Sequence, residues 1–175
     1  MLTFGLLSLT VLLILADQLT KYLALTQLHY ADRVISVIDG VFEFRYLENR
    51  GVAFGMMEGQ IWLFIPMTLL ISAIIIAMLL RSPMRKHKLF SIPAAMVMAG
   101  AIGNLIDRIA YGYVIDFLYF KLIDFPIFNF ADCCVVIGAC LLFVFFIFGM
   151  KEYEDLPIRT AFFGIPMKNK ENTDG

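Results

Sequence analysis

Four long apolar stretches constrain this chain more than any other feature. They cover residues of about 4–25, 61–80, 89–109 and 129–150, and each approaches the roughly 20 apolar residues that an α-helix needs to cross a bilayer. Of the 175 residues, 61% are hydrophobic, against about 45–50% in soluble domains, and the mean hydropathy is +0.82. We therefore predict an all-α membrane protein with four transmembrane helices, folded as a single domain over residues 1–150.

The short loop at residues 81–88 sets the predicted orientation, because it carries four Lys or Arg residues. Short basic loops stay in the cytoplasm. With four spans, both termini and the tail 151–175 would be cytoplasmic, and residues 26–60 and 110–128 would be extracytoplasmic. The tail is polar and of mixed charge, so we expect it to be mobile.

The two extracytoplasmic regions carry different patterns. In the first, Asp39-Gly40 separates two runs rich in β-forming residues, which is a hairpin signal, and Phe42 and Phe44 alternate with charged residues. We expect a small β-sheet on the membrane surface. The second region, residues 111–128, is dense in aromatic side chains and is predicted to lie at the membrane interface.

Charge and cysteine content exclude several classes of function. The net charge of −1 gives no basic patch for nucleic acid. Cys133, Cys134 and Cys140 all fall in the last apolar stretch, and two of them are adjacent. We interpret them as small packing residues rather than as a disulfide framework. No spaced set of Cys and His residues indicates a metal site.

Ionisable residues inside apolar stretches are costly and need partners. Asp17 and Lys21 are four residues apart with the acid first, which favours an ion pair on one helix. They form either a structural pair or the border of a polar pocket. On the third stretch, two stripes of small residues end in Asn104, Asp107 and Arg108, so close helix packing would carry these polar groups to the outer boundary. We interpret Arg108 as a side chain that extends to the membrane interface, with Asp107 as its partner.

Two further acids lie near the start of the last stretch. Asp132 falls in its first turn, three residues after Asn129, a favoured N-cap residue, and the helix dipole alone can account for such an acid. Asp116 lies in the aromatic region, and the intervening chain can fold back to bring the two carboxylates together. Two carboxylates that touch away from water share one proton. Such a pair can activate a water molecule and protonate a carbonyl, as in aspartic peptide hydrolysis.

Two other functions are compatible with intramembrane acids. A small proton-coupled transporter or channel would place polar residues at the bilayer midplane. Here the costly residues favour the outer ends, and the second stretch is apolar throughout its centre. A purely structural subunit would need neither Asp116 nor Asp132. The residues therefore favour the hydrolase.

Five short motifs, spread between about residues 16 and 140, resemble those of lipoprotein signal peptidase (signal peptidase II) of bacteria. Each motif is short, and the resemblance depends on their order and on their placement against the four predicted spans. The motifs are DQLTK at 17–21, NRGVAF at 49–54, GNLIDR at 103–108, VIDF at 114–117 and FPIFNFAD at 125–132.

This resemblance implies an aspartic endopeptidase of the bacterial cytoplasmic membrane that uses no metal or cofactor and has its active site at the extracytoplasmic leaflet. Its substrates would be prolipoproteins that carry diacylglycerol on a cysteine, and it would cut just before that cysteine. Its partners would be these substrates and membrane lipids. We expect a monomer.

By their positions in the motifs, Asp116 and Asp132 match the catalytic pair of the family. The residues that match its pocket are Asn49, Gly51, Asn104, Arg108 and Asn129. Asp17, Lys21 and Asp107 match supporting residues. Gly51 and Ala53 would let the backbone approach closely beside Asn49. Cys133 follows Asp132 directly and can abut the pocket.

Overall fold

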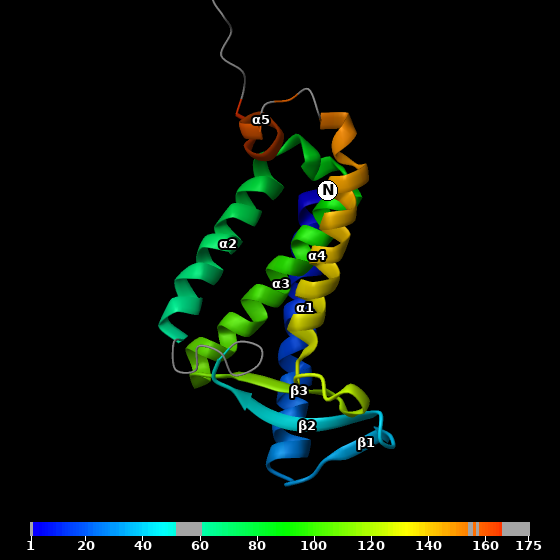
Figure 1. Ribbon diagram of the computed structural model, residues 1–175. Coiled ribbons are helices and arrows are strands. Elements are labelled where there is room, and N and C mark those ends of the chain that lie inside the picture. Colours follow the sequence, from blue (N-terminus) through cyan, green and yellow to red (C-terminus); the bar gives the residue numbers. More distant parts are fainter. Residues whose placement is uncertain (1, 52–60, 154–155, 157, 166–175) are drawn as a thin grey trace, which may run out of the picture.

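Helix α3 lies at the centre of the helix bundle, as the computed structural model shows (Figure 1). The residues that the structure describes are 2–51, 61–153, 156 and 158–165. The helices that pack against α3 (Lys88–Tyr111) are α1 (Leu2–Ala24), α2 (Ile61–Arg81) and α4 (Phe130–Phe148). A π-helical turn at Leu25–His29 extends α1. The four helices match the four apolar stretches of the sequence.

Three helices of the described chain are long and apolar enough to cross a membrane. They are α1 with its π-helical extension, α3 and α4. In α2 the apolar part Ile65–Arg81 is shorter, so a fourth span stays a prediction. The fold is therefore mostly helical, and it contains enough long apolar helices for a multi-pass membrane protein.

Small residues bring α3 and α4 into close contact. Ala95 and Ala99 are completely buried on α3, and a Cβ atom placed on Gly100 would overlap the backbone oxygen of Ala131 in α4. In lipid, helices associate through such close packing, because burial of apolar surface provides no driving force there. The predicted stripe of small residues on α3 therefore allows close contact with α4.

A three-stranded antiparallel sheet closes one end of the bundle, and its order is β1-β2-β3. Strands β1 (Ile35–Ile38) and β2 (Phe42–Asn49) form the predicted hairpin around Asp39-Gly40. Gly40 has a φ of 72°, a conformation that glycine adopts without steric cost. The predicted sheet is therefore confirmed, although the side of the membrane on which it lies stays a prediction.

Strand β3 (Val114–Phe120) lies within the aromatic region that is predicted to lie at the membrane interface. These residues pair with β2, with Asn49 opposite Val114 and Leu47 opposite Asp116. Ile115 and Phe117 of β3 pack with Ala24 and Leu28 at the end of α1. Part of this region is thus buried against α1 as a strand, which the sequence did not predict, and its place at the membrane interface stays a prediction.

The chain after α4 also differs from the predicted mobile tail, up to residue 165. Helix α5 (Ile158–Phe163) lies against the opposite end of the bundle from the sheet (Figure 1). Tyr153 and Ala161 are buried in a cluster with Phe90 and Phe145. The buried Ser82 hydroxyl donates a hydrogen bond of 2.5 Å to the Ala161 carbonyl. Apolar burial therefore orders a segment that its sequence composition marks as polar.

The contact between α3 and α4 can be tested with Gly100→Val. The new side chain meets the α4 backbone, which cannot move like a flexible side chain, so we expect a loss of about 1–3 kcal/mol in unfolding free energy. The measurement is thermal unfolding of the purified protein in detergent. Gly5→Val is the matched control, because a Cβ on Gly5 has no neighbour within 4 Å. Equal melting temperatures for the two variants would contradict the close packing.

Candidate active site

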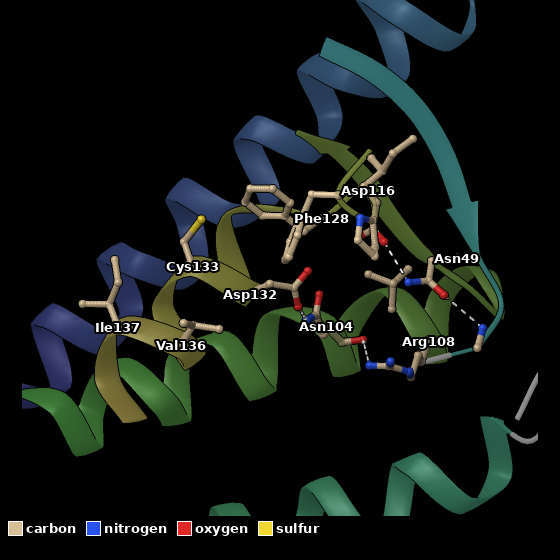
Figure 2. Close-up of a pocket in the computed structure, with 14 residues that line it drawn as sticks. Asn49, Asn104, Arg108, Asp116, Phe128, Asp132, Cys133, Val136 and Ile137 are labelled. Atoms are coloured by element: carbon tan, nitrogen blue, oxygen red, sulfur yellow. Dashed lines mark hydrogen bonds between the residues drawn. The ribbon is translucent and has the colours of Figure 1, made fainter. Parts of the chain in front are cut away.

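A cavity of about 560 Å³ opens where the sheet meets the ends of α3 and α4. Figure 2 shows residues from β2, β3, α3 and α4 around it. Both predicted catalytic residues, Asp116 and Asp132, line this cavity, as do Asn49, Asn104 and Arg108. Residues that are far apart in the sequence thus line one cavity, as we expect of residues that the sequence assigns to a single pocket.

Asp116 is held by two asparagine side chains. It lies in β3 and is 1% exposed. Asn49, the last residue of β2, donates from Nδ2 to Asp116 Oδ2 at 2.8 Å. Asn129 donates from Nδ2 to Asp116 Oδ1 at 2.6 Å. Each carboxylate oxygen of this buried acid therefore has an amide donor, which offsets part of the cost of its burial.

Asp132 lies in the first turn of α4 and forms a capping box with Asn129. The Asn129 side chain accepts from Asp132 N at 3.0 Å, and Asn129 N donates to Asp132 Oδ2 at 3.1 Å. This confirms the prediction that Asn129 caps the helix. The other oxygen, Asp132 Oδ1, accepts from Asn104 Nδ2 at 2.8 Å. Asp132 is half-buried, so it can meet a substrate or water in the cavity.

Two asparagines join the two acids into one hydrogen-bonded network. Asn129 Nδ2 donates to Asn104 Oδ1 at 3.0 Å as well as to Asp116. Asn104 in turn donates to Asp132. A chain of side-chain amides therefore runs from one carboxylate to the other and fixes their relative position.

The pKa of Asp116 is raised to about 7. Burial is the largest cause, because it disfavours the charged form, and the negative charge of Asp132 is the second. Hydrogen bonds from Asn49 and Asn129 and the charge of Lys21 act in the opposite direction. Near neutral pH, Asp116 can thus both hold and release a proton.

Lys21 is the centre of a buried ionic cluster beside the cavity. Its Nζ lies 3.0 Å from Asp17 Oδ2 and 2.9 Å from Asp107 Oδ2, and all three side chains are at most 2% exposed. Lys21 also donates to Asn104 Oδ1 at 2.9 Å. The predicted Asp17–Lys21 pair therefore exists. Neither of its residues lines the cavity, and Lys21 is connected to it through Asn104.

Asp107 is placed differently from the sequence analysis. It was assigned to Arg108 at the interface, whereas the structure buries it and pairs it with Lys21. Its Oδ2 also accepts from Ile115 N at 3.1 Å. In the same way, Asp17 Oδ1 accepts from Ala131 N at 2.9 Å. The two acids thus tie the cluster to the strand that carries Asp116 and to the helix that carries Asp132.

Gln18 was missed by the sequence analysis. Its Nε2 donates to Asp17 Oδ2 at 3.2 Å and to Asp107 Oδ1 at 3.1 Å, and it reaches the Gly103 carbonyl at 3.3 Å. The position of Gln18 in the DQLTK motif was a signal, since an amide beside a buried acid needs a polar partner itself.

The remaining predicted pocket residues also lie near the cavity. Arg108 lines it and donates from one guanidinium nitrogen to the Asn104 carbonyl at 3.3 Å. Gly51 lines it too, and its N–H donates to Asn49 Oδ1 at 3.0 Å. Cys133 faces the cavity, as its position next to Asp132 allowed. Ala53 lies outside the described residues.

Comparison with known proteins shows the family of this chain. A family model described as "Signal peptidase (SPase) II" matches residues 9–148, a range that includes the acids and asparagines above. The chain belongs to the signal peptidase II family. It is 40% identical over 148 residues to a lipoprotein signal peptidase of Pelodictyon phaeoclathratiforme, with 79% of this chain and 87% of that protein covered.

Other members of the signal peptidase II family and solved structures are also similar. A lipoprotein signal peptidase of Symbiobacterium thermophilum is 42% identical over 138 residues, covering 78% of this chain and 90% of that protein. A solved structure described as a bacterial membrane enzyme is 26% identical and gives a TM-score of 0.77, with 87% of this chain and 93% of that chain covered. Family and helices together indicate a multi-pass membrane protease.

The ionic cluster of this signal peptidase II family member can be tested with Lys21→Met. The substitution leaves Asp17 and Asp107 buried without their cation, so we expect a loss of about 3–5 kcal/mol in unfolding free energy. The measurement is chemical or thermal unfolding in detergent. Arg33→Met, which also removes one positive charge but from an exposed side chain, should have little effect. Wild-type stability of Lys21→Met would show that the cluster does not hold the site together.

Proposed function

We propose that this chain is an aspartic endopeptidase that removes signal peptides from diacylglyceryl-modified prolipoproteins and cuts just before the lipidated cysteine. Asp116 and Asp132 act as its catalytic pair. The observation that carries the proposal is that both carboxyl groups line one cavity and are joined by amide hydrogen bonds. Membership of the signal peptidase II family supports the class of substrate.

In the proposed reaction, the Asp132 carboxylate takes a proton from a water molecule, whose oxygen attacks the carbonyl carbon of the scissile peptide. Protonated Asp116 donates its proton to the carbonyl oxygen, which becomes a hydroxyl group of the tetrahedral intermediate. The intermediate then collapses as the C–N bond breaks, and the leaving nitrogen receives the proton that Asp132 took from water. Asp116 regains its proton from the hydroxyl group. The raised pKa of Asp116 supports its role as the acid.

The other polar residues of the cavity position these groups. Asn49 and Asn129 hold Asp116, and Asn104 holds Asp132. Arg108 brings a positive charge to the same cavity, where it can stabilise negative charge that develops on the carbonyl oxygen. Fixed donors of this kind reduce the reorganisation that the reaction requires.

The apolar walls of the cavity suit the lipid of the substrate. Beyond Asp132, the cavity continues along α4 past Cys133, Val136 and Ile137 (Figure 2). Val136 is 61% exposed and Ile137 is 50% exposed, so acyl chains can reach them from the bilayer. The diacylglyceryl group would then lie along α4, with the peptide bond before its cysteine beside the two acids.

We propose four spans in the bacterial cytoplasmic membrane, with both termini in the cytoplasm and the active site at the extracytoplasmic leaflet. The basic loop at residues 81–88 supports this orientation, because it joins α2 to α3 at the end of the bundle opposite the sheet (Figure 1). The protein would act as a monomer, since one chain contributes all the acids and amides of the described site.

The alternative, a proton-coupled transporter or channel, fits less well. It would need polar groups that continue through the bundle. At the opposite end, the described residues instead form an apolar cluster that includes Met84, Phe90 and Phe145.

Asp116→Asn and Asp132→Asn test the proposed chemistry. Each removes a proton-transfer group while keeping similar size, so cleavage of a diacylglyceryl prolipoprotein should slow by at least about 100-fold. Cleavage is followed by gel shift with the purified variants in detergent, and correct folding by size-exclusion chromatography. Asp124→Asn, a change at an exposed acid outside the cavity, should retain wild-type activity. Full cleavage by both dyad variants would overturn the peptidase mechanism.

The pH dependence of kcat/KM tests the role of Asp116. Because Asp116 must be protonated and its pKa is about 7, kcat/KM should fall above roughly pH 7, by about tenfold per pH unit. Asn49→Ala removes a hydrogen bond that favours the charged form, so the alkaline limb should move to higher pH. Glu48→Gln, on the same strand, should leave it in place. An Asn49→Ala limb at lower pH would contradict this assignment.

A further inference from the structure

A second, wholly apolar crevice lies at the end of the bundle opposite the sheet. Four helices line it, and its volume is about 330 Å³. It is formed by Ile74 and Met78 of α2, Phe90 of α3, Phe146 of α4 and Phe162 of α5, together with four further apolar residues. This crevice does not include any residue of the proposed active site.

The crevice is accessible from the side of the bundle. Ile74 is 41% exposed and Phe146 is 38% exposed, and they lie on α2 and α4, two of the helices that line the crevice. Water does not fill an apolar cavity favourably, because it finds no hydrogen-bond partners there. In a bilayer, the available apolar group of suitable length is the acyl chain of a lipid.

Two basic residues lie close in the chain to residues that line this crevice. Arg81 lies in the last turn of α2, three residues after Met78, and Lys88 begins α3, two residues before Phe90. Both side chains are exposed, and the ion pairs of the described residues include neither. A Cβ on Gly164, just after α5, would overlap the Arg81 carbonyl, so α5 ends against the last residue of α2. Basic groups between membrane helices favour anionic lipid headgroups.

We infer that the crevice binds one anionic phospholipid. One acyl chain lies between α2, α4 and α5, and the phosphate group lies beside Arg81 and Lys88. The positive charges explain the preference for an anionic headgroup, and the apolar walls explain why a lipid binds rather than free phosphate. Such a lipid would join α2 and α5, which contact α3 less extensively, to the centre of the bundle.

Native mass spectrometry of the purified full chain tests this inference. The protein in detergent is incubated with dioleoyl phosphatidylglycerol or with dioleoyl phosphatidylcholine, which has the same acyl chains and no net charge. We expect one phosphatidylglycerol to be retained in preference. Each neutralised basic residue should weaken its binding by about fivefold, so the double variant Arg81→Gln/Lys88→Gln should bind it roughly 25-fold more weakly. Arg33→Gln, exposed at the other end, should bind it like the wild type.

A second pair of variants tests the position of the acyl chain. Ile74→Trp places a larger side chain at the wall of the crevice and should reduce the retention of phosphatidylglycerol severalfold. Leu70→Trp, one turn earlier on α2 and outside the crevice, should not. Equal retention of the two lipids, equal binding by Arg81→Gln/Lys88→Gln and Arg33→Gln, or equal effects of the two Trp variants would overturn the inference. Displacement of the lipid by inorganic phosphate would indicate a simple anion site and would overturn it as well.

Discussion

The rest of the site depends on one interaction, the pairing of the Lys21 ammonium group with two buried acids. The ammonium group is buried between Asp17 and Asp107 and also donates to Asn104. Removing charges from water is costly unless they are paired, so these three side chains must fold together or not at all. Asp107 Oδ2 also accepts from the backbone of β3, and Asp17 Oδ1 accepts from the backbone of α4. One cation thereby positions the two elements that carry Asp116 and Asp132.

The two pairs of acids are compensated in different ways, and this difference suits different roles. Asp17 and Asp107 each pair with the Lys21 ammonium group, at 3.0 Å and 2.9 Å. Asp116 and Asp132 receive neutral amide hydrogens instead. Amide donors hold a carboxyl group in place and still leave it able to exchange a proton. The proposed catalytic pair is therefore positioned by its surroundings without being neutralised by them.

The sequence predicted features that depend on local chemistry. Apolar length predicted the helices, Asp39-Gly40 the hairpin, and the spacing of Asn129 and Asp132 the helix cap. Contacts between segments that are distant in the sequence were harder to predict from it. The pairing of Asp107 with Lys21 and the addition of β3 to the hairpin join parts of the chain that no periodicity connects. The folding of α5 onto the bundle was missed for the same reason, since its residues lie beside residues of α2, α3 and α4.

Infrared titration of the protonated-carboxyl stretch tests the central claim, that burial and the charge of Asp132 keep Asp116 protonated near neutral pH, most directly. Subtraction of the Asp116→Asn spectrum isolates the Asp116 band in the purified protein. The account predicts a band that disappears with a midpoint near pH 7, and a lower midpoint in Asp132→Asn, because the neighbouring negative charge is gone. Absence of the band at pH 6, or a midpoint that does not change in Asp132→Asn, would contradict it.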